Sequence, residues 1–348
     1  MKKSMHHITW NDIGPLTSLL RIPGKKITFV IHVNPDGDAL GSALGLLNLF
    51  GKMGHSCKVV SPNNYPGFLK WLPGSDQVIL MDKSPADARE LIQQADLLFA
   101  VDFNDLKRTK KLYEVFHASK AYKVMIDHHP GPEMEADCIL SDTSASSTAE
   151  LMYRFIREAS LINWMDRDIA SCLFVGIMTD TGCFSYNSSN RNTWLIVAEL
   201  LDYGIDKDRL YYLTYDNYSS HRMRLLGFSL NVKMEVFPEY RTGIIWLTRE
   251  DLRTYHFEAG DTEGFVNYPL SIRGIRFSAL FIEKEDHVRI SFRSKGDFAV
   301  NVFSKKYFNG GGHANASGGE SYQSITDTIK RFKELLPVYQ AKLCDYEV

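Results

Sequence analysis

The sequence predicts an α/β protein made of two domains of unequal size. Short apolar runs alternate with helical patterns in the first half of the chain, which indicates a mostly parallel sheet flanked by helices. A mainly helical stretch follows, and the strand–helix alternation then returns. At 348 residues the chain is long enough for two domains that each bury a core. We assign residues 1–210 to the first domain, 211–228 to a helical linker and 229–348 to a smaller α/β domain.

The elements of the first domain follow from its apolar runs and their spacing. The expected strands are Ile27–Val33, Cys57–Ser61, Val78–Met81, Leu97–Asp102 and Lys123–Ile126. The expected helices are Leu40–Met53, Pro85–Gln94, Thr148–Ala159 and Arg167–Met178. The polar, Tyr-rich stretch Asp206–Gly227 has a helical period and is typical of a connector between domains. In parallel sheets, ligands bind beyond the carboxyl ends of the strands.

The second domain is expected to contain four strands and two helices. The expected strands are Val232–Val236, Gly243–Leu247, Phe277–Ile282 and Val288–Phe292, and the expected helices lie near Asp297–Phe308 and Gln323–Leu336. Because proline lacks an N–H group and disrupts a helix, Pro337 predicts the end of the second helix.

Composition excludes several classes of protein. A formal charge of −2 and a pI near 6.6 argue against a protein that binds long nucleic acid, which normally requires a basic face. The five cysteines form no C-x-x-C pair, which favours reduced thiols. Trp10, Asn11 and Asp12 interrupt any signal-like apolar core, and no run of 18 apolar residues exists. We therefore expect a cytoplasmic protein with no membrane partner.

Acidic and imidazole side chains follow four apolar segments. The first expected strand runs into His32, Asp36 and Asp38 within 31-IHVNPDGDALGSALG-45. Another strand ends at Asp102, a third ends in Asp127-His128-His129, and an apolar helical run ends in Asp180. Because the carboxyl ends of parallel strands meet at one edge, at least five carboxylates would crowd one crevice. Such a group of bare anions would be costly.

A bound metal resolves this electrostatic conflict. A single Asp could instead be a helix N-cap, as Asp38 could be for a helix that begins near Ala39. Four coincidences favour metal binding, and the absence of thiolates argues against a structural cysteine-type zinc site. Several shared acids favour a dinuclear site with ions roughly 3.5–4 Å apart. Mixed oxygen and imidazole ligands favour Mn²⁺ over Mg²⁺. Gly37 and Gly41 would let the backbone approach the ions or a phosphate closely.

A second candidate binding segment is the glycine-rich stretch 307-YFNGGGHANASGG-319. A flexible loop is its default interpretation, but consecutive glycines can also direct several N–H groups toward one anion. Between Arg273 and Tyr307 there are eight Lys or Arg residues against four Asp or Glu residues. Arg293 closes a strand, where its guanidinium could bind a phosphate. A binding site for a phosphate is therefore expected here.

Together these motifs resemble those of the DHH/DHHA1 phosphoesterases. This group includes RecJ, the nano-RNases with phosphoadenosine-phosphate phosphatase activity, and bacterial cyclic-dinucleotide phosphodiesterases. The matching motifs are 32-HVNPDGDALGS-42, 101-VDFND-105, 127-DHHP-130, 180-DTG-182 and 310-GGGHANASGG-319. The resemblance implies an N-terminal DHH catalytic domain, a C-terminal DHHA1 substrate-binding domain, and hydrolysis of a phosphate ester by a hydroxide that bridges two metal ions.

The resemblance also implies a role for each site residue. One ion would be held by His32, Asp36, Asp102 and Asp180, and the other by Asp38, Asp102, His128 and Asp180. Asp127 would support the neighbouring imidazoles, and His129 would face the scissile phosphate as a donor or acid. The substrate's phosphate or terminal nucleotide would be bound by Arg293, Ser294, Gly310, Gly311, Gly312 and His313.

Several classes of substrate are compatible with this site, and the sequence favours short oligoribonucleotides. Two compact domains without additional nucleic-acid modules favour a manganese-dependent enzyme that releases 5′-mononucleotides from short oligoribonucleotides and also acts on 3′-phosphoadenosine 5′-phosphate. The alternative is hydrolysis of cyclic di-AMP or its linear product pApA. A non-catalytic nucleotide sensor is less favoured because every expected metal position holds a competent ligand. A homodimer is expected from the resemblance alone.

Overall fold

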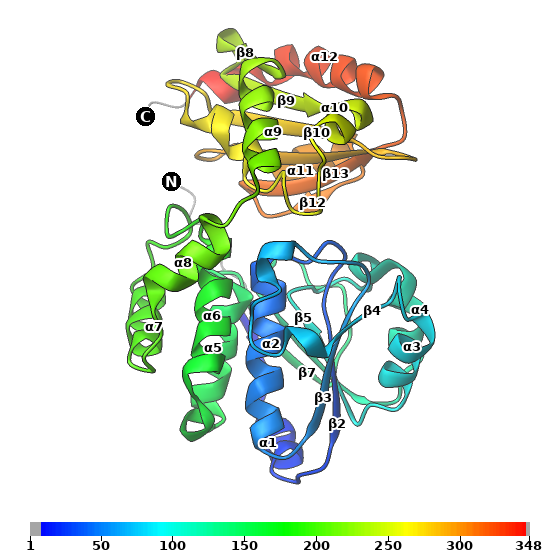
Figure 1. Cartoon of the computed structure of the whole chain (residues 1–348), viewed down its shortest axis with the longest axis vertical. Coiled ribbons are helices and arrows are strands. Elements are labelled where there is room, and N and C mark those ends of the chain that lie inside the picture. Colours follow the sequence, from blue (N-terminus) through cyan, green and yellow to red (C-terminus); the bar gives the residue numbers. More distant parts are fainter. Residues whose placement is uncertain (1–7, 346–348) are drawn as a thin grey trace. The chain divides into compact units, whose positions relative to one another are not determined.

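The chain folds into two compact units, Met1–Asn217 and Tyr218–Val348, in a computed structural model that describes residues 8–345 (Figure 1). The division lies inside the range 211–228 that we assigned to a linker. Two helices take up most of the Tyr-rich connector, α8 (Lys207–Tyr215) in the first unit and α9 (Ser220–Asn231) in the second. The connector is therefore two helices, each of which packs on its own unit.

The first unit is built on a seven-stranded, mostly parallel sheet. The strand order is β1-β7-β6-β5-β2-β3-β4, and every neighbouring pair is parallel except β1 and β7. The strands are β1 (Ile8–Trp10), β2 (Lys26–Val30), β3 (Ser56–Ser61), β4 (Val78–Leu80), β5 (Leu97–Val101), β6 (Tyr122–Asp127) and β7 (Cys138–Asp142). The five expected strands are confirmed, whereas β1 and β7 were not expected.

Helices cover both faces of this sheet (Figure 1). One face packs on the larger core with α1 (Gly14–Leu20), α2 (Gly37–Lys52), α5 (Thr148–Glu158), α6 (Arg167–Asp180), α7 (Arg191–Leu201) and α8. The other face packs on a smaller core with α3 (Pro85–Gln93) and α4 (Tyr113–Ala118). Short 3₁₀ helices occupy connections: η1 (Gly67–Leu69), η2 (Ser75–Gln77), η3 (Leu106–Leu112) and η4 (Ile162–Trp164). The alternation in the sequence thus gives a doubly covered sheet, as expected.

Glycines bring α2 and α6 into close contact. A Cβ atom on Gly41 would lie 2.4 Å from the Cys172 carbonyl oxygen, and one on Gly37 would lie 2.4 Å from Thr179 Oγ1. A Cβ atom on Gly176 would lie 2.6 Å from the Ala149 Cβ atom. We expected Gly37 and Gly41 to admit an ion or phosphate. The structure shows another role, because their missing side chains make room for α6.

The second unit holds a mixed six-stranded sheet with the order β12-β13-β11-β10-β9-β8, in which only β9 and β10 are parallel. The strands are β8 (Met234–Phe237), β9 (Thr242–Leu247), β10 (Phe277–Glu283), β11 (Val288–Ser294), β12 (Gly311–Gly312) and β13 (Ala316–Ser321). A Phe-rich core joins one face to α11 (Val300–Tyr307) and α12 (Ile325–Cys344). The other face packs on α9, α10 (Arg249–Thr254) and η6 (Phe265–Ser271), and η5 (Pro238–Tyr240) connects β8 to β9.

Helix α12 does not end at Pro337, so that prediction is wrong. The helix continues to Cys344 through the proline. A proline inside a helix removes one backbone hydrogen bond, at a cost of about 3 kcal/mol. Phe332, Leu336 and Leu343 are buried on both sides of the proline, and packing offsets that cost.

No helix within residues 8–345 combines the length and the apolar character needed to cross a bilayer.

Because α2 and α6 are in close contact, the effect of a Gly→Ala substitution on stability should depend on where the glycine lies in α2. Gly41→Ala should lower the free energy of unfolding by about 1–3 kcal/mol, because the added methyl group overlaps the Cys172 carbonyl oxygen. Gly51→Ala in the same helix is the control: its Cβ atom would meet nothing within 4 Å, so it should stabilise the protein by about 0.5–1 kcal/mol. Urea unfolding followed by circular dichroism measures both. Equal stability of Gly41→Ala and the wild type would contradict the packing described here.

Candidate active site at the carboxyl edge of the first sheet

The candidate site lies where three adjacent strands end. His32 follows β2, Asp102 follows β5, and β6 ends at Asp127 with His128 next in the chain. The order of the sheet reverses between β2 and β5, because β3 and β4 lie on one side of β2, and β5, β6 and β7 lie on the other. A reversal of this kind opens a crevice outside the carboxyl ends of the strands.

Asp36 and Asp38 have different roles at the start of α2. Asp36 is the N-cap, since its Oδ1 atom accepts hydrogen bonds from the backbone N–H groups of Asp38 (3.1 Å) and Ala39 (3.0 Å). The N-cap role that we allowed for Asp38 is therefore wrong. Asp38 is 1% exposed and accepts hydrogen bonds from the N–H groups of Thr148 (2.7 Å) and Ala149 (2.8 Å). Its carboxylate thus binds the N-terminus of α5, where backbone donors lack partners within the helix.

Asp102 lies at the centre of the site and is 2% exposed. Its φ angle is +63°, in the left-handed region that Asp tolerates better than most residues. The Oδ1 atom accepts a hydrogen bond from the Thr148 hydroxyl at 2.8 Å, and the Oδ2 atom lies 3.1 Å from His32 Nε2. The turn at the end of β5 therefore directs the carboxylate toward both α5 and His32.

Both His32 and His128 present Nε2 to carboxylates. The Nδ1 atom of His128 lies 3.3 Å from the Ala145 carbonyl oxygen, and that of His32 lies 2.9 Å from the Val33 carbonyl oxygen. Because a carbonyl oxygen can only accept a hydrogen bond, the Nδ1 atom of each ring carries the proton and donates the hydrogen bond. His128 Nε2 lies 3.5 Å from an Asp180 oxygen, 3.8 Å from an Asp102 oxygen and 3.9 Å from an Asp38 oxygen. Either a proton or a cation is needed between that nitrogen and the three acids.

Two groups made up entirely of expected metal ligands are close enough to hold a divalent cation. The atoms of His32, Asp36 and Asp102 lie within 4.8 Å of one another, and so do those of Asp38, Asp102 and His128. Each group offers carboxylate oxygens and an imidazole nitrogen whose other ring nitrogen is already held by a carbonyl, an arrangement common around metal-binding histidines. Asp102 is shared by both groups. Asp180 completes the expected set through its contact with His128.

The charges of the site shift its pKa values in opposite directions. Burial, together with the negative charges of Asp102 and Asp180, raises the pKa of Asp38 well above its ordinary value. Burial acts in the same direction on Asp102, but its contact with His32 Nε2 and the nearby imidazoles outweigh burial and lower the pKa of Asp102. The site therefore holds its carboxylates under strong mutual repulsion, which a bound cation would relieve.

Asp127 orients His129. Asp127 is fully buried, and its Oδ1 atom lies 2.6 Å from His129 Nδ1 while its Oδ2 atom accepts a hydrogen bond from the His129 N–H group at 3.0 Å. His129 Nε2 lies 3.4 Å from Nη1 of Arg108, which also donates to the Asp102 carbonyl oxygen at 3.2 Å. Burial and the charge of Arg108 together lower the pKa of His129, although Asp127 opposes them.

Thr148 and Arg108 are site residues that the sequence interpretation missed. Thr148 begins α5 and Arg108 lies in η3, so neither residue directly follows the last residue of a strand. Thr148 contacts both Asp38 and Asp102, and Arg108 contacts His129. The apolar spacing predicted a helix that begins at Thr148, but no local pattern indicated that this helix end would meet the strand ends.

In the second unit, the expected phosphate-binding residues lie on and around a tight hairpin. Gly311 and Gly312 form β12 opposite β13, and His313 and Ala316 close the turn through a bond of 2.7 Å from the His313 N–H group. Gly310 donates its N–H group to the Ser304 carbonyl oxygen, so that donor is not directed at an anion. The Ser294 hydroxyl is buried and donates to the Phe298 carbonyl oxygen at 2.6 Å. Arg293 is half-buried at the end of β11.

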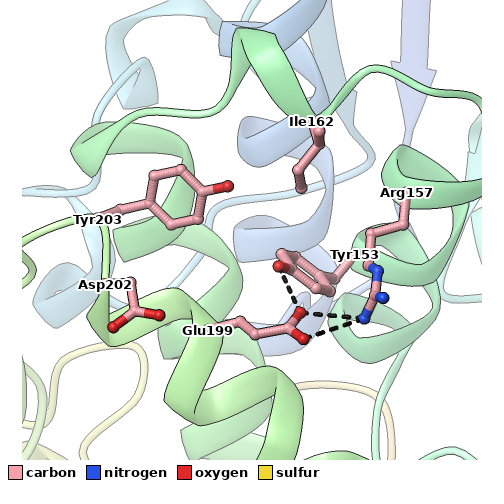
Figure 2. Close-up of a pocket in the computed structure, with 6 residues that line it drawn as sticks. All are labelled: Tyr153, Arg157, Ile162, Glu199, Asp202 and Tyr203. Carbon is pink, nitrogen blue, oxygen red and sulfur yellow. Dashed lines mark hydrogen bonds and ion pairs between the residues drawn. The ribbon is translucent and has the colours of Figure 1, made fainter.

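A pocket of about 580 Å³ lies elsewhere in the first unit, between α5, η4 and α7 (Figure 2). Its polar groups mainly bind one another: the Tyr153 hydroxyl donates to Glu199 at 2.7 Å, and Arg157 donates to both oxygens of Glu199 at 3.1 Å. None of the expected site residues lines this pocket. The chemistry therefore gathers at the edge of the sheet rather than in this cavity.

Comparison with known proteins identifies two matching domain families. The model of the DHH family, N-terminal domain, matches residues 26–177, and the model of the DHHA1 domain matches residues 252–339. The bifunctional oligoribonuclease and PAP phosphatase NrnA of Bacillus subtilis is 28% identical over 88% of this chain and 93% of that protein.

Two solved structures have a similar fold. The crystal structure of an exopolyphosphatase-related protein from Bacteroides fragilis has a TM-score of 0.89 at 41% identity and covers 94% of this chain and 96% of that chain. RecJ from Thermus thermophilus, crystallised with Mn²⁺, has a TM-score of 0.55 at 12% identity and covers 96% of this chain and 55% of its own. At that identity the second likeness shows the fold alone.

In the metal-free protein, the pKa values of the adjacent residues His128 and His129 should be shifted in opposite directions. Burial lowers the pKa of His128, but the carboxylates of Asp180 and Asp102 outweigh it and raise the pKa, whereas the pKa of His129 is lowered. The stabilisation from protonated His128 is therefore fully present below its ordinary pKa of about 6.5 and is lost as the pH rises through its raised value. NMR titration after removal of metals measures both. A His129 that holds its proton to higher pH than His128 would contradict this assignment.

Proposed function

Because the chain belongs to the DHH family of phosphoesterases and carries a DHHA1 domain, we propose that it hydrolyses short oligoribonucleotides to 5′-mononucleotides and also removes the 3′-phosphate of 3′-phosphoadenosine 5′-phosphate. The observation that carries this proposal is the shared carboxylate of Asp102 between two groups of oxygen and imidazole ligands. The oligoribonuclease and PAP phosphatase activities named for the Bacillus subtilis relative support the substrate class.

We assign two divalent cations, Mn²⁺ by preference, to the candidate site. The ligands proposed for them are His32, Asp36, Asp38, Asp102, His128 and Asp180. The donor set supports this choice, because it combines carboxylates with imidazoles and contains no thiolate. When bound, such ions lower the pKa of water and neutralise charge that develops on phosphoryl oxygens.

His129, Asp127 and Arg108 would act on the substrate side of the reaction. The hydrogen bond to Asp127 fixes Nδ1 of His129, so Nε2 is the atom that can exchange a proton with the leaving oxygen. Its lowered pKa makes the protonated ring a stronger acid, so Nε2, once protonated, would pass that proton to the leaving oxygen readily. Arg108 lies beside this nitrogen and would add positive charge toward a phosphate.

The second unit is proposed to bind the substrate through Arg293, His313 and the neighbouring glycines. The match to the DHHA1 domain supports this role. Ser294 lies next to Arg293, and its buried hydroxyl donates to the Phe298 carbonyl oxygen. We therefore propose that Ser294 contributes by fixing the loop around Phe298.

Metal binding should raise the melting temperature through Asp102. Ions that bind only the folded protein at 100 times their Kd add about 2.7 kcal/mol, which corresponds to roughly 5–10 °C in a domain of this size. Asp102→Asn keeps the shape of the side chain and removes its charge, so it should abolish the Mn²⁺-dependent shift. It should also lower the turnover of a labelled diribonucleotide at least about 100-fold.

A substrate panel tests the proposed specificity. Initial rates would be compared among a diribonucleotide, a longer RNA, 3′-phosphoadenosine 5′-phosphate, pApA and cyclic di-AMP. Faster turnover of cyclic di-AMP or pApA than of the diribonucleotide would favour the alternative substrate class. Failure to release mononucleotides in the presence of Mn²⁺ would reject the oligoribonuclease proposal.

Arg293 should contribute to substrate binding rather than to the chemical step. Arg293→Ala is expected to raise KM for phosphate-bearing substrates about 10-fold or more and to leave kcat nearly unchanged, because it removes a charge-assisted contact. Arg289→Ala is the matched control, since position 289 lies on the same strand and, four residues away, on the same face of β11. Equal effects of both substitutions would show a general loss of positive charge instead of a specific contact.

A further inference from the structure

Glu150 is a buried carboxylate that neither of the two ligand groups contains. It lies in the first turn of α5 and is 1% exposed. Its Oε2 atom accepts three hydrogen bonds, from the Ser146 N–H group (3.1 Å), the Ser146 hydroxyl (2.7 Å) and the Thr193 hydroxyl of α7 (2.7 Å). Its Oε1 atom is buried and has no hydrogen-bond partner among the described residues. Burial of a carboxylate with one unpaired oxygen costs stability, so a purely stabilising role does not explain it.

A local helix cap does not explain Glu150 either. The sequence Ser147-Thr148-Ala149-Glu150 matches the S-x-x-E pattern of a capping box, in which the glutamate would bind the N–H group of the N-cap residue. Half of that pattern is present, because the Ser147 hydroxyl oxygen accepts a hydrogen bond from the Glu150 N–H group at 3.1 Å. The Glu150 side chain, however, reaches one residue further and holds Ser146.

The segment that Glu150 holds contacts three of the proposed metal ligands. The carbonyl of Ala145 accepts from His128 Nδ1. The N–H groups of Thr148 and Ala149 donate to Asp38, and the Thr148 hydroxyl donates to Asp102. Residues 145–149 thus set the ring orientation of His128 and the positions of both carboxylates. Ser146 lies in the middle of this segment, and the side chain of Glu150 binds it through two donors.

We propose that Glu150 is a positioning residue that fixes residues 145–149, and through them His128, Asp38 and Asp102, for divalent-cation binding. This inference rests on the metal site of the proposed function. Thr193 ties the same carboxylate to α7, so the position of the segment also depends on a helix that has no proposed ligand of its own. Residues that orient metal ligands from outside the coordination sphere typically change metal affinity 10–100-fold when they are replaced.

The test replaces Glu150 with Gln and compares it with Glu199→Gln. Glu199 also connects α5 to α7, but its hydrogen bonds go to Tyr153 and Arg157 and not to residues 145–149 (Figure 2). In the metal-free protein, amide hydrogen exchange at Thr148 and Ala149 should become at least about 10-fold faster in Glu150→Gln and should stay unchanged in Glu199→Gln. Isothermal titration with Mn²⁺ should show an affinity about 10–100-fold weaker in Glu150→Gln only.

Thr193→Val provides a milder variant in case Glu150→Gln folds poorly. It removes one of the three donors to Glu150 and should give a smaller change of the same kind, while Thr193→Ser should behave as the wild type. Unchanged exchange and unchanged Mn²⁺ affinity in Glu150→Gln would overturn the inference. So would equal acceleration of exchange throughout the first unit in both glutamate variants. If the wild type binds no Mn²⁺, the proposed metal site fails, and the exchange data still decide whether Glu150 fixes the segment.

Discussion

The carboxylate of Asp38 on the N-terminus of α5 is the interaction on which the rest of the site depends. Two backbone N–H groups of that helix donate to it, and its negative charge complements the positive end of the helix dipole. The contact joins α2, which carries Asp38, to α5, which carries Thr148. Gly176 of α6 makes this approach possible, since a Cβ atom there would lie 3.0 Å from Asp38 Oδ1.

This contact also explains how like charges can gather at one edge of the sheet. Backbone and hydroxyl donors from α5 partly stabilise Asp38 and Asp102, and the imidazoles of His32 and His128 lie beside these carboxylates. The remaining repulsion appears in the raised pKa of Asp38. A folded site with this repulsion is suited to a cation, because a bound ion relieves the repulsion between the carboxylates.

Much of the fold could be predicted because its signals are local. The strand at Leu97–Val101 is a continuous apolar run, the strand at Tyr122–Asp127 holds the apolar run Val124–Ile126, and α6 is apolar over most of its length. Strands β1 and β7 escaped prediction because each mixes apolar with polar residues and shows only a weak pattern. The helix through Pro337 shows the opposite case, in which tertiary packing overrides a strong local signal.

The sequence by itself determined which residues could carry the chemistry, since acids and imidazoles after buried apolar runs indicate a shared edge of a parallel sheet. The DHH and DHHA1 motifs then indicated the class of reaction. Only the tertiary structure decided how those groups are held: Asp36 caps α2, Asp38 binds α5, and Arg108 and Thr148 enter the site. The contacts of Thr148 and Ala149 with Asp102 and Asp38 join segments 46 to 111 residues apart, and the packing of α2, α5 and α6 brings most of them together. The glycines that we assigned to ligand approach serve that packing, because the distance between two helices is a property of the fold and not of either segment.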